Sequence, residues 1–238
     1  MSGILFIISA PSGSGKTTLV NELRQYVGNL EFSVSYTTRA PRGSEQDGRE
    51  YHFISREQFQ QMAANQEFLE YAEVFGNFYG TAKTVLNDAA RRGNDLLLDI
   101  DVQGAAQVKQ RLPQAVSIFV LPPSRTELES RLRKRSLSEN VVSQDVIRRR
   151  LDTARKEIEN YPSYDYILVN DRLEYSTDQL VAIVQGERVT FSGKTPSPQE
   201  EQYLETARKC LKGNMEEQIR GILATFNVPT HTAISTQR

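Results

Sequence analysis

The sequence of 238 residues has little of several features that would narrow its class at once. Cys210 is its one cysteine, which excludes a disulfide within the chain, and a lone thiol makes a poor metal site. The net charge is −1, so no basic excess indicates nucleic acid as a partner and no acidic tail is present. We assign His52 and His231 to structural or surface positions.

Long hydrophobic runs are also missing. No apolar stretch approaches the ~20 residues that a membrane helix needs, and no basic stretch precedes the first apolar run. We therefore expect a soluble cytoplasmic protein with no membrane partner. The length fits one large domain or two small ones with a full core.

A glycine-rich stretch between a predicted strand (4–9) and a predicted helix (17–26) is the first motif that carries chemistry. It consists of Ala10, Pro11, Ser12, Gly13, Ser14, Gly15, Lys16, Thr17 and Thr18. Such a loop directs backbone N–H groups at a polyphosphate, and the lysine reaches the outer phosphates. The usual pattern has glycine where this chain has Ala10. The alternative is a strand-to-helix turn without a ligand.

Strands and helices alternate along most of the chain, which predicts a parallel sheet with helices on both faces. Further strands are expected at 32–36, 50–54, within 68–79, and at 96–101, 117–121 and 166–169. Further helices are expected at 81–92, 103–111 and 176–185. One more should begin at Ser55, one at Ser124, and one should end before Pro162. Ligands bind at the carboxyl ends of such strands. The glycine-rich loop, Asp99, Asp101 and Asn170 should meet there.

Local signals predict where several helices begin and end. Ser55 with Gln58 and Ser197 with Glu200 have capping-box spacing, and Gly93 and Gly186 suit helix ends. We expect 136–143 to be mobile and Thr190–Pro198 to be a linker. Two amphipathic helices should follow the linker and pack on the main domain or on another chain. Their apolar stripes are Tyr203, Leu204, Ala207 and Leu211, then Ile219, Ile222, Leu223 and Phe226, and the last ten residues should be disordered.

A second group of residues suits a monophosphate. Arg39 and Arg42 lie in one polar loop, and Tyr51 and Tyr79 follow in the next segments. A guanidinium binds phosphate bidentately, and a phenol adds a hydrogen bond. Each arginine alone would be assigned to the solvated surface.

At this point the sequence resembles the guanylate kinases over residues 1–188. The matching segments occur in the order of that family: 9–16, 35–42, 48–53, 73–80, 98–104, 119–124 and 167–171. The family resemblance also accounts for Ala10. It implies a P-loop nucleoside monophosphate kinase fold of the α/β class, with a parallel five-stranded core sheet, an inserted GMP-binding subdomain and a lid.

The resemblance implies magnesium-dependent transfer of the γ-phosphoryl of ATP to GMP, a reaction of purine metabolism that recycles GMP. ATP would be bound by Ala10–Thr18, Arg135 and Asn170, and GMP by Ser35, Arg39, Arg42, Tyr51, Glu70, Tyr79, Thr81 and Asp101. Lys16, Arg39, Arg135 and Arg150 would be catalytic. Thr17 would bind magnesium directly and Asp99 through water. Ser136 stands where the family usually has glycine.

The implied organisation is a kinase domain at 1–188, with core segments 1–34, 82–124 and 151–188, a GMP-binding insertion at 35–81 and a lid at 125–150. A linker at 189–198 and a helical extension at 199–238 follow. One alternative is a guanylate-kinase-like peptide-binding module without activity, but Lys16, Thr17, Arg39 and Asp99 are all in place. Glu70 and Ser35 disfavour a kinase for another nucleoside monophosphate. Partners other than ATP and GMP are not indicated, and assembly of several copies stays open.

Overall fold

The computed structural model describes residues 3–74, 76–138 and 143–230. The chain divides into two compact units, one made of 1–9 and 28–117 and the other of 10–27 and 118–238. Residues 139–142 of the segment predicted to be mobile lie outside the described residues. So do 231–238, which include His231 and most of the ten C-terminal residues predicted to be disordered. None of the described helices is both long enough and apolar enough to cross a membrane.

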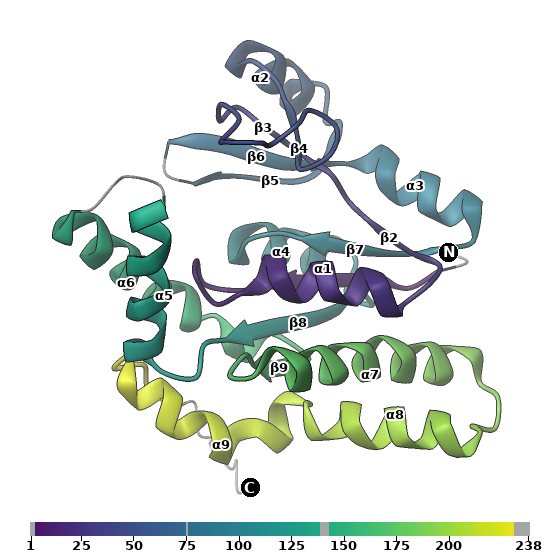
Figure 1. Cartoon of the computed structure of the whole chain (residues 1–238). Coiled ribbons are helices and arrows are strands. Elements are labelled where there is room, and N and C mark those ends of the chain that lie inside the picture. The colour runs from purple at the N-terminus through teal and green to yellow at the C-terminus, as the bar shows by residue number, and fades with distance from the viewer. Residues whose placement is uncertain (1–2, 75, 139–142, 231–238) are drawn as a thin grey trace, which may run out of the picture. The chain divides into compact units, whose positions relative to one another are not determined.

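Five strands form one parallel sheet in the order β2-β7-β1-β8-β9, which confirms the predicted fold class (Figure 1). In the first unit, β1 (Leu5–Ser9) pairs with β7 (Asp95–Asp99), and β7 pairs with β2 (Leu30–Phe32). The central strands are buried along nearly their whole length, as expected for a sheet covered on both faces. Helices α3 (Lys83–Arg92) and α4 (Val102–Arg111) belong to the same unit.

The first unit also contains a second sheet of four strands in the order β4-β3-β6-β5. Its strands are β3 (Ser35–Thr37), β4 (Tyr51–Phe53), β5 (Phe68–Val74) and β6 (Asn77–Ala82), and helix α2 (Arg56–Ala64) covers one face (Figure 1). Phe59 of α2 stacks on Phe68 and Phe78, with ring centroids 4.4 and 5.3 Å apart. The predicted capping box of Ser55 and Gln58 begins α2.

The prediction of one strand over 32–36 was wrong. The chain leaves the large sheet after Phe32 and enters the small sheet at Ser35. The alternation of apolar and polar residues continues through this change of sheet, so the pattern did not reveal it. The predicted helix at 81–92 begins at Lys83, since Thr81 and Ala82 still pair in β6. Gly93 ends it with φ 70°, as predicted.

The second unit contains α1 (Lys16–Tyr26), β8 (Val116–Leu121) except its first residues, β9 (Tyr166–Val169) and the remaining helices. These are α5 (Arg125–Ser138), α6 (Gln144–Ile158), α7 (Leu173–Ser192), α8 (Pro198–Lys209) and α9 (Lys212–Thr225), with a short 3-10 helix at Tyr161–Ser163. Helix α6 buries Ile147, Leu151, Ala154 and Ile158, apolar residues that recur three or four positions apart along one face of the helix.

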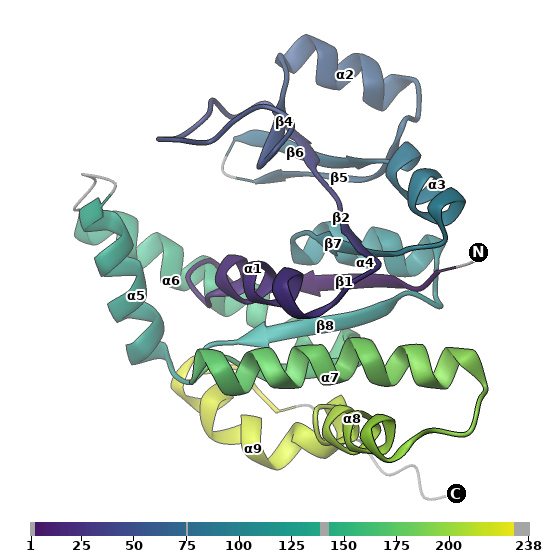
Figure 2. The same cartoon turned by 45° about the vertical axis from the view of Figure 1, so that its right-hand side comes forward.

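Helix α7 does not end at Gly186. It continues to Ser192 and ends at Gly193, whose φ is 64°, so the linker before α8 is shorter than predicted. Gly186 has a different role, because α7 and α8 lie side by side (Figures 1 and 2). A Cβ at position 186 would lie 3.2 Å from Ala207 Cβ and 3.5 Å from the carbonyl oxygen of Tyr203. The glycine therefore permits a close approach of the two helices.

The two C-terminal helices pack within the second unit, which is one of the two arrangements predicted from their apolar stripes. Ser197 and Glu200 form the predicted capping box of α8. Ala207, Ile219, Leu223 and Phe226 are buried, but Leu211 is 37% exposed, and Cys210 beside it is fully buried. Leu211 leaves the apolar stripe because the helix ends at Lys209 and residues 210–211 turn towards β9.

Candidate active site

The glycine-rich loop has the backbone that a phosphate cradle requires. Gly13 and Gly15 have φ angles of 92° and 89°, which only glycine adopts freely. Gly15 precedes α1 and, having no side chain, offers no side-chain cap to the start of this helix. Thr17 and Thr18 are exposed on this first turn. The helix N-terminus and the loop can therefore accept an anion.

Two side chains hold the loop from behind. The carbonyl oxygen of Ser14 accepts a 2.7 Å hydrogen bond from Asn170 Nδ2 and a 3.4 Å hydrogen bond from Arg131 Nη1. Arg131 Nη2 also donates to the Asn170 carbonyl at 3.1 Å. The Ser14 hydroxyl is buried and has no hydrogen-bond partner among the described residues. These bonds fix the Ser14 carbonyl, and with it the conformation of the loop.

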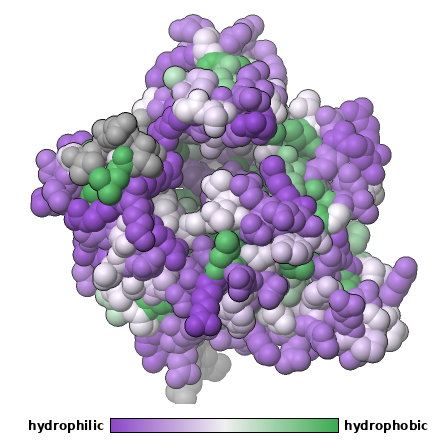
Figure 3. Space-filling view, in the orientation of Figure 1, coloured by the Kyte–Doolittle hydropathy of each residue, from purple (hydrophilic) through white to green (hydrophobic). Residues whose placement is uncertain are grey.

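The two predicted lid arginines lie on neighbouring helices of the second unit. Arg135 is exposed on α5, and Arg150 is half-buried on α6. Arg150 Nη1 donates to Ser136 Oγ at 3.4 Å. The surface of α5 and α6 that Figure 3 presents is mainly hydrophilic.

Ser136, expected at the start of a mobile segment, is 1% exposed within α5. The polar composition of 136–143 did not indicate this burial, because composition does not show on which face of a helix a residue lies. Where the resemblance implies a glycine, the Ser136 hydroxyl is a hydrogen-bond acceptor for Arg150.

In the first unit, Arg39 is held by a carboxylate. Its guanidinium contacts Glu45 at 2.9–3.0 Å and donates to the Ala40 carbonyl at 2.7 Å. The same Glu45 accepts the backbone N–H of Arg42 at 2.8 Å. Glu45 thus fixes the loop that follows β3, and a phosphate on Arg39 would compete with this carboxylate.

The predicted tyrosines surround Arg39. The guanidinium carbon lies 5.4 Å from the centre of the Tyr51 ring, and the Tyr51 and Tyr79 rings are 5.8 Å apart. Arg39, Tyr51 and Tyr79 therefore form one cluster, as the sequence predicted. The side chain of Arg42 is exposed, and its described contact is made by its backbone.

Glu70 is the most strongly perturbed carboxyl group of this unit. It lies on β5 with an exposure of 3%, and burial raises its pKa to about 7, although Thr81 lowers it through hydrogen bonds. Thr81 Oγ1 lies 3.4 Å from Ser35 Oγ. The small sheet thus brings the predicted residues Ser35, Glu70 and Thr81 into a buried polar cluster.

The start of α4 completes this cluster. Asp101 does not end a strand as predicted, because β7 ends at Asp99, but caps α4 by accepting the N–H of Gly104 at 2.8 Å. A Cβ on Gly104 would lie 2.3 Å from Glu70 Oε2. Asp99 is half-buried at the end of β7. Glu45, Gly104 and Arg131 are the residues that sequence reasoning missed.

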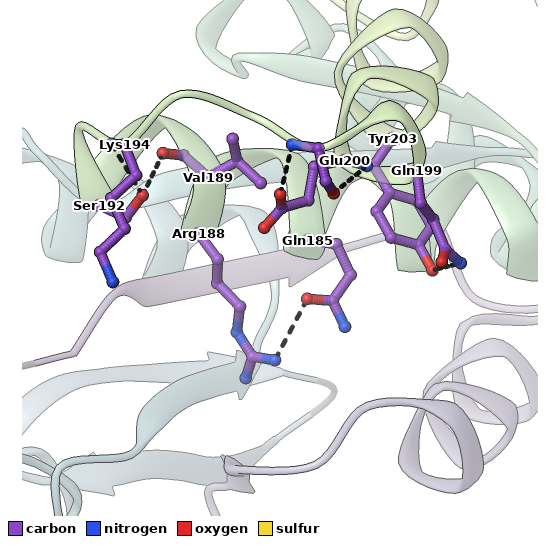
Figure 4. Close-up of a pocket in the computed structure, with 9 residues that line it drawn as sticks. Gln185, Arg188, Val189, Ser192, Lys194, Gln199, Glu200 and Tyr203 are labelled. Carbon is purple, nitrogen blue, oxygen red and sulfur yellow. Dashed lines mark hydrogen bonds between the residues drawn. The ribbon is translucent and has the colours of Figure 1, made fainter.

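A groove of about 570 Å³ lies elsewhere, at the junction of α7 and α8 (Figure 4). Its lining groups mostly bond to each other: Arg188 Nη1 to Gln185 at 3.5 Å, Ser197 N to Glu200 at 2.7 Å, and Gln199 to the Tyr203 hydroxyl at 3.3 Å. No residue predicted to bind a nucleotide lines this groove. It is therefore separate from the candidate site.

Comparisons with known proteins agree on one family. The guanylate kinase family model matches residues 2–187. A guanylate kinase of Koribacter versatilis (strain Ellin345) is 59% identical over 230 residues, which cover 97% of this chain and 98% of that protein. A guanylate kinase of Dechloromonas aromatica (strain RCB) is 48% identical over 194 residues, which cover 82% of this chain and 94% of that protein.

A solved structure supports the same assignment. The crystal structure of guanylate kinase from Anaplasma phagocytophilum aligns with a TM-score of 0.66 and 36% identity, covering 87% of this chain and 95% of that chain. The residue clusters described above lie within residues 1–188, the part of the sequence that resembled this family. The chain belongs to the guanylate kinase family.

Proposed function

We propose that this protein transfers the γ-phosphoryl group of ATP to GMP, giving ADP and GDP. The observation that carries the proposal is the buried cluster of Glu70, Thr81 and Ser35 in a chain that also has a glycine-rich phosphate loop. The N1 and N2 groups of guanine are two neighbouring donors, which one carboxylate can accept together. Adenine offers no such pair, so the cluster favours guanine.

ATP is assigned to the second unit. The loop N–H groups and Lys16 hold its phosphates, and Asn170 lies on the adenine side. Arg135 and Arg150 neutralise the charge on the transferring phosphoryl group. The support for Asn170 is its 2.7 Å hydrogen bond to the Ser14 carbonyl, which ties it to the loop.

GMP is assigned to the first unit. Its phosphate would replace Glu45 as the partner of Arg39, with Tyr51 and Tyr79 donating hydroxyl hydrogen bonds and Arg42 adding charge. Its guanine would bind to Glu70, Thr81 and Ser35, with Asp101 beside them. The proximity of Arg39 to both tyrosine rings supports the phosphate assignment.

Magnesium is assigned to Thr17 and, through water, to Asp99. Among the described residues no group of three or more His, Cys, Asp or Glu side chains could hold a metal ion. One hydroxyl from Thr17 and one water-bridged carboxylate from Asp99 fit magnesium, because this ion keeps several waters and takes most other ligands from the phosphates of its nucleotide. When bound, it neutralises phosphate charge during transfer.

The reaction needs little covalent chemistry from the protein. Phosphoryl transfer requires the donor and acceptor oxygens in line, and water must be excluded so that ATP is not hydrolysed. We propose that 35–81 and 125–150 act as the GMP-binding and lid segments of a kinase domain at 1–188. Both substrates are cytoplasmic metabolites, and we place the enzyme in that compartment.

The discriminating experiment is a coupled assay of ADP release with ATP, magnesium and each of GMP, AMP, CMP and UMP. We expect turnover with GMP to exceed the others by at least two orders of magnitude, since a site built to hydrogen-bond polar groups of its substrate rejects an analogue that lacks them by roughly 10⁴. Equal rates with all four would contradict the guanine assignment. No turnover with any of them would favour an inactive peptide-binding module.

A further inference from the structure

The C-terminal helices α8 and α9 lie outside the family match, which ends at residue 187, yet α9 contacts α5, whose Arg131 bonds to the phosphate loop. We propose that α9 positions the ATP-binding loop through α5, with Thr225 as the positioning residue. This inference rests on the proposed ATP site but not on the identity of the phosphate acceptor. The aligned region of the Koribacter versatilis relative includes almost the whole chain, whereas that of the Dechloromonas aromatica relative covers 82%.

The first contact joins α9 to the start of α5. Thr225 Oγ1 accepts the backbone N–H of Arg125, the first residue of α5, at 3.0 Å. The same hydroxyl donates to the Ile222 carbonyl at 2.7 Å, so its lone pair remains available for Arg125. Figures 1 and 2 both show the end of α9 beside the start of α5. Thr225 thus supplies a helix cap from a residue 100 positions away.

The chain's own cap is incomplete without this contact. Ser124 Oγ accepts the N–H of Glu127 at 3.1 Å, which satisfies one of the free donors at the start of α5. Arg125 N–H is another of these donors. The local sequence and α9 therefore share the capping of α5.

The segment before α9 is itself fixed, so it can serve as a support. The Ile167 N–H donates to the Cys210 carbonyl at 2.8 Å, and the Lys212 N–H donates to the Asp165 carbonyl at 3.0 Å. These bonds attach the α8–α9 connection to β9 in antiparallel fashion. Leu223 and Phe226, at the end of α9, are 0% and 2% exposed. The end that carries Thr225 is therefore packed in place.

The last contacts lead from α5 to the phosphate loop. Leu128 and Leu132 of α5 are fully buried, and a Cβ on Gly13 would lie 2.9 Å from Leu132 Cδ2 and 3.0 Å from Leu128 Cδ1. Between them, Arg131 donates to the Ser14 carbonyl at 3.4 Å. A displacement of the first turns of α5 would be transmitted to Gly13 and Ser14 because the packing leaves no free space.

The test uses the full-length protein and three variants. Thr225→Val removes the hydroxyl at constant shape, Thr225→Ser keeps it, and Thr126→Val makes the same change at an exposed threonine of α5. For each protein we would measure the Kd for ATP with magnesium, the KM values for ATP and GMP, and hydrogen exchange in the first turn of α5. Loss of one capping bond corresponds to about fivefold weaker ATP binding.

We expect Thr225→Val to raise the Kd and KM for ATP about fivefold, to leave the KM for GMP within about twofold, and to speed exchange at Arg125. Thr225→Ser and Thr126→Val should match the wild type. Faster exchange without weaker ATP binding would overturn the proposal, because Thr225 would then serve stability alone. Unchanged exchange and binding would also overturn it.

The two proposals fail in different ways. If the wild type phosphorylates no GMP but Thr225→Val still weakens ATP binding, the positioning role holds and the proposed function fails. If the wild type phosphorylates GMP and Thr225→Val binds ATP normally, the proposed function holds and the positioning role of Thr225 fails.

Discussion

Gly104 is in contact with Glu70: a side chain at position 104 would place its Cβ 2.3 Å from Glu70 Oε2 and 3.0 Å from Glu70 Cδ. The absence of a side chain at the start of α4 therefore makes room for the carboxylate that we assign to guanine. Position 104 has an ordinary helical backbone, so the requirement is one of space and not of φ.

We predict that Gly104→Ala raises the KM for GMP at least tenfold and leaves the KM for ATP unchanged. The new methyl group must displace Glu70, at a cost of roughly 1–3 kcal/mol in the free energy of unfolding. Steady-state kinetics and urea unfolding would measure both effects. Gly221→Ala is the matched control, because a Cβ at this glycine of α9 meets nothing within 4 Å. An unchanged KM for GMP would contradict the placement of guanine.

The stability of the protein should depend on pH through Glu70. Its pKa is about 7 in the folded state, against a usual value of 4.5, so between these values the folded state keeps a proton that the unfolded chain has lost. Stability therefore falls as pH rises from about 4.5 to about 7, by roughly 3 kcal/mol. Glu70→Gln should remove this contribution. Urea unfolding of both proteins at pH 5 and pH 8 tests it, and an equal difference between them at both pH values would refute it.

GMP binding should release a proton from Glu70. Guanine donates two hydrogen bonds to the carboxylate form, so binding lowers the pKa that burial raised. Below about pH 7 the Kd for GMP should rise by up to tenfold per pH unit. Calorimetry in buffers of different ionisation enthalpy counts the protons released. Glu70→Gln keeps the titration of the GMP phosphate and serves as the control, and equal proton release by both proteins would count against this role.

We predict that Lys16→Met lowers kcat by about 10²–10³ while the folded state is retained, since Lys16 acts as a positive charge on the transferring phosphate. Lys83→Met provides a matched control. Lys83 begins α3 as Lys16 begins α1, and its side chain is exposed. Steady-state kinetics of both variants would measure kcat, and circular dichroism would show whether the folded state is retained. A Lys16→Met protein with nearly normal kcat would remove this lysine from the mechanism.

Asn170→Asp should weaken ATP binding and destabilise the fold. The change replaces the Nδ2 donor with an oxygen facing the Ser14 carbonyl, 2.7 Å away, at a position only 6% exposed. An unpaired buried acceptor costs about 1–3 kcal/mol, and a charge costs more. Thermal unfolding and the Kd for ATP would report the effect. Asn160→Asp, at an exposed asparagine that also donates to a carbonyl, should have little effect.

Local patterns predicted much of the fold because their physical causes are local. The capping boxes at Ser55 and Ser197 and the buried face of α6 depend on residues three or four positions apart. Gly186 shows the limit of such patterns. A glycine near the expected end of a helix suits termination, but here its cause is α8, which the pattern in α7 does not contain.

The candidate site, too, was only partly predictable from the sequence. Arg39, Tyr51 and Tyr79 were predicted to lie together, and the structure places them in one cluster. Glu45 was missed because no spacing rule distinguishes a loop carboxylate that holds an arginine from a solvated one. The contact of Thr225 with Arg125 joins residues 100 positions apart, and only the packing of α9 brings them together.

The attachment of residues 210–212 to β9 also concerns the solution behaviour of the protein. β9 is the last strand of its sheet, and its residues Tyr166–Val169 form an apolar run. An uncovered strand of this kind offers free N–H and C=O groups to other chains. The α8–α9 connection occupies two of these groups through the Ile167 N–H and the Asp165 carbonyl. The extension therefore also protects the chain against edge-to-edge aggregation, and a protein shortened to the family boundary would be exposed to that hazard.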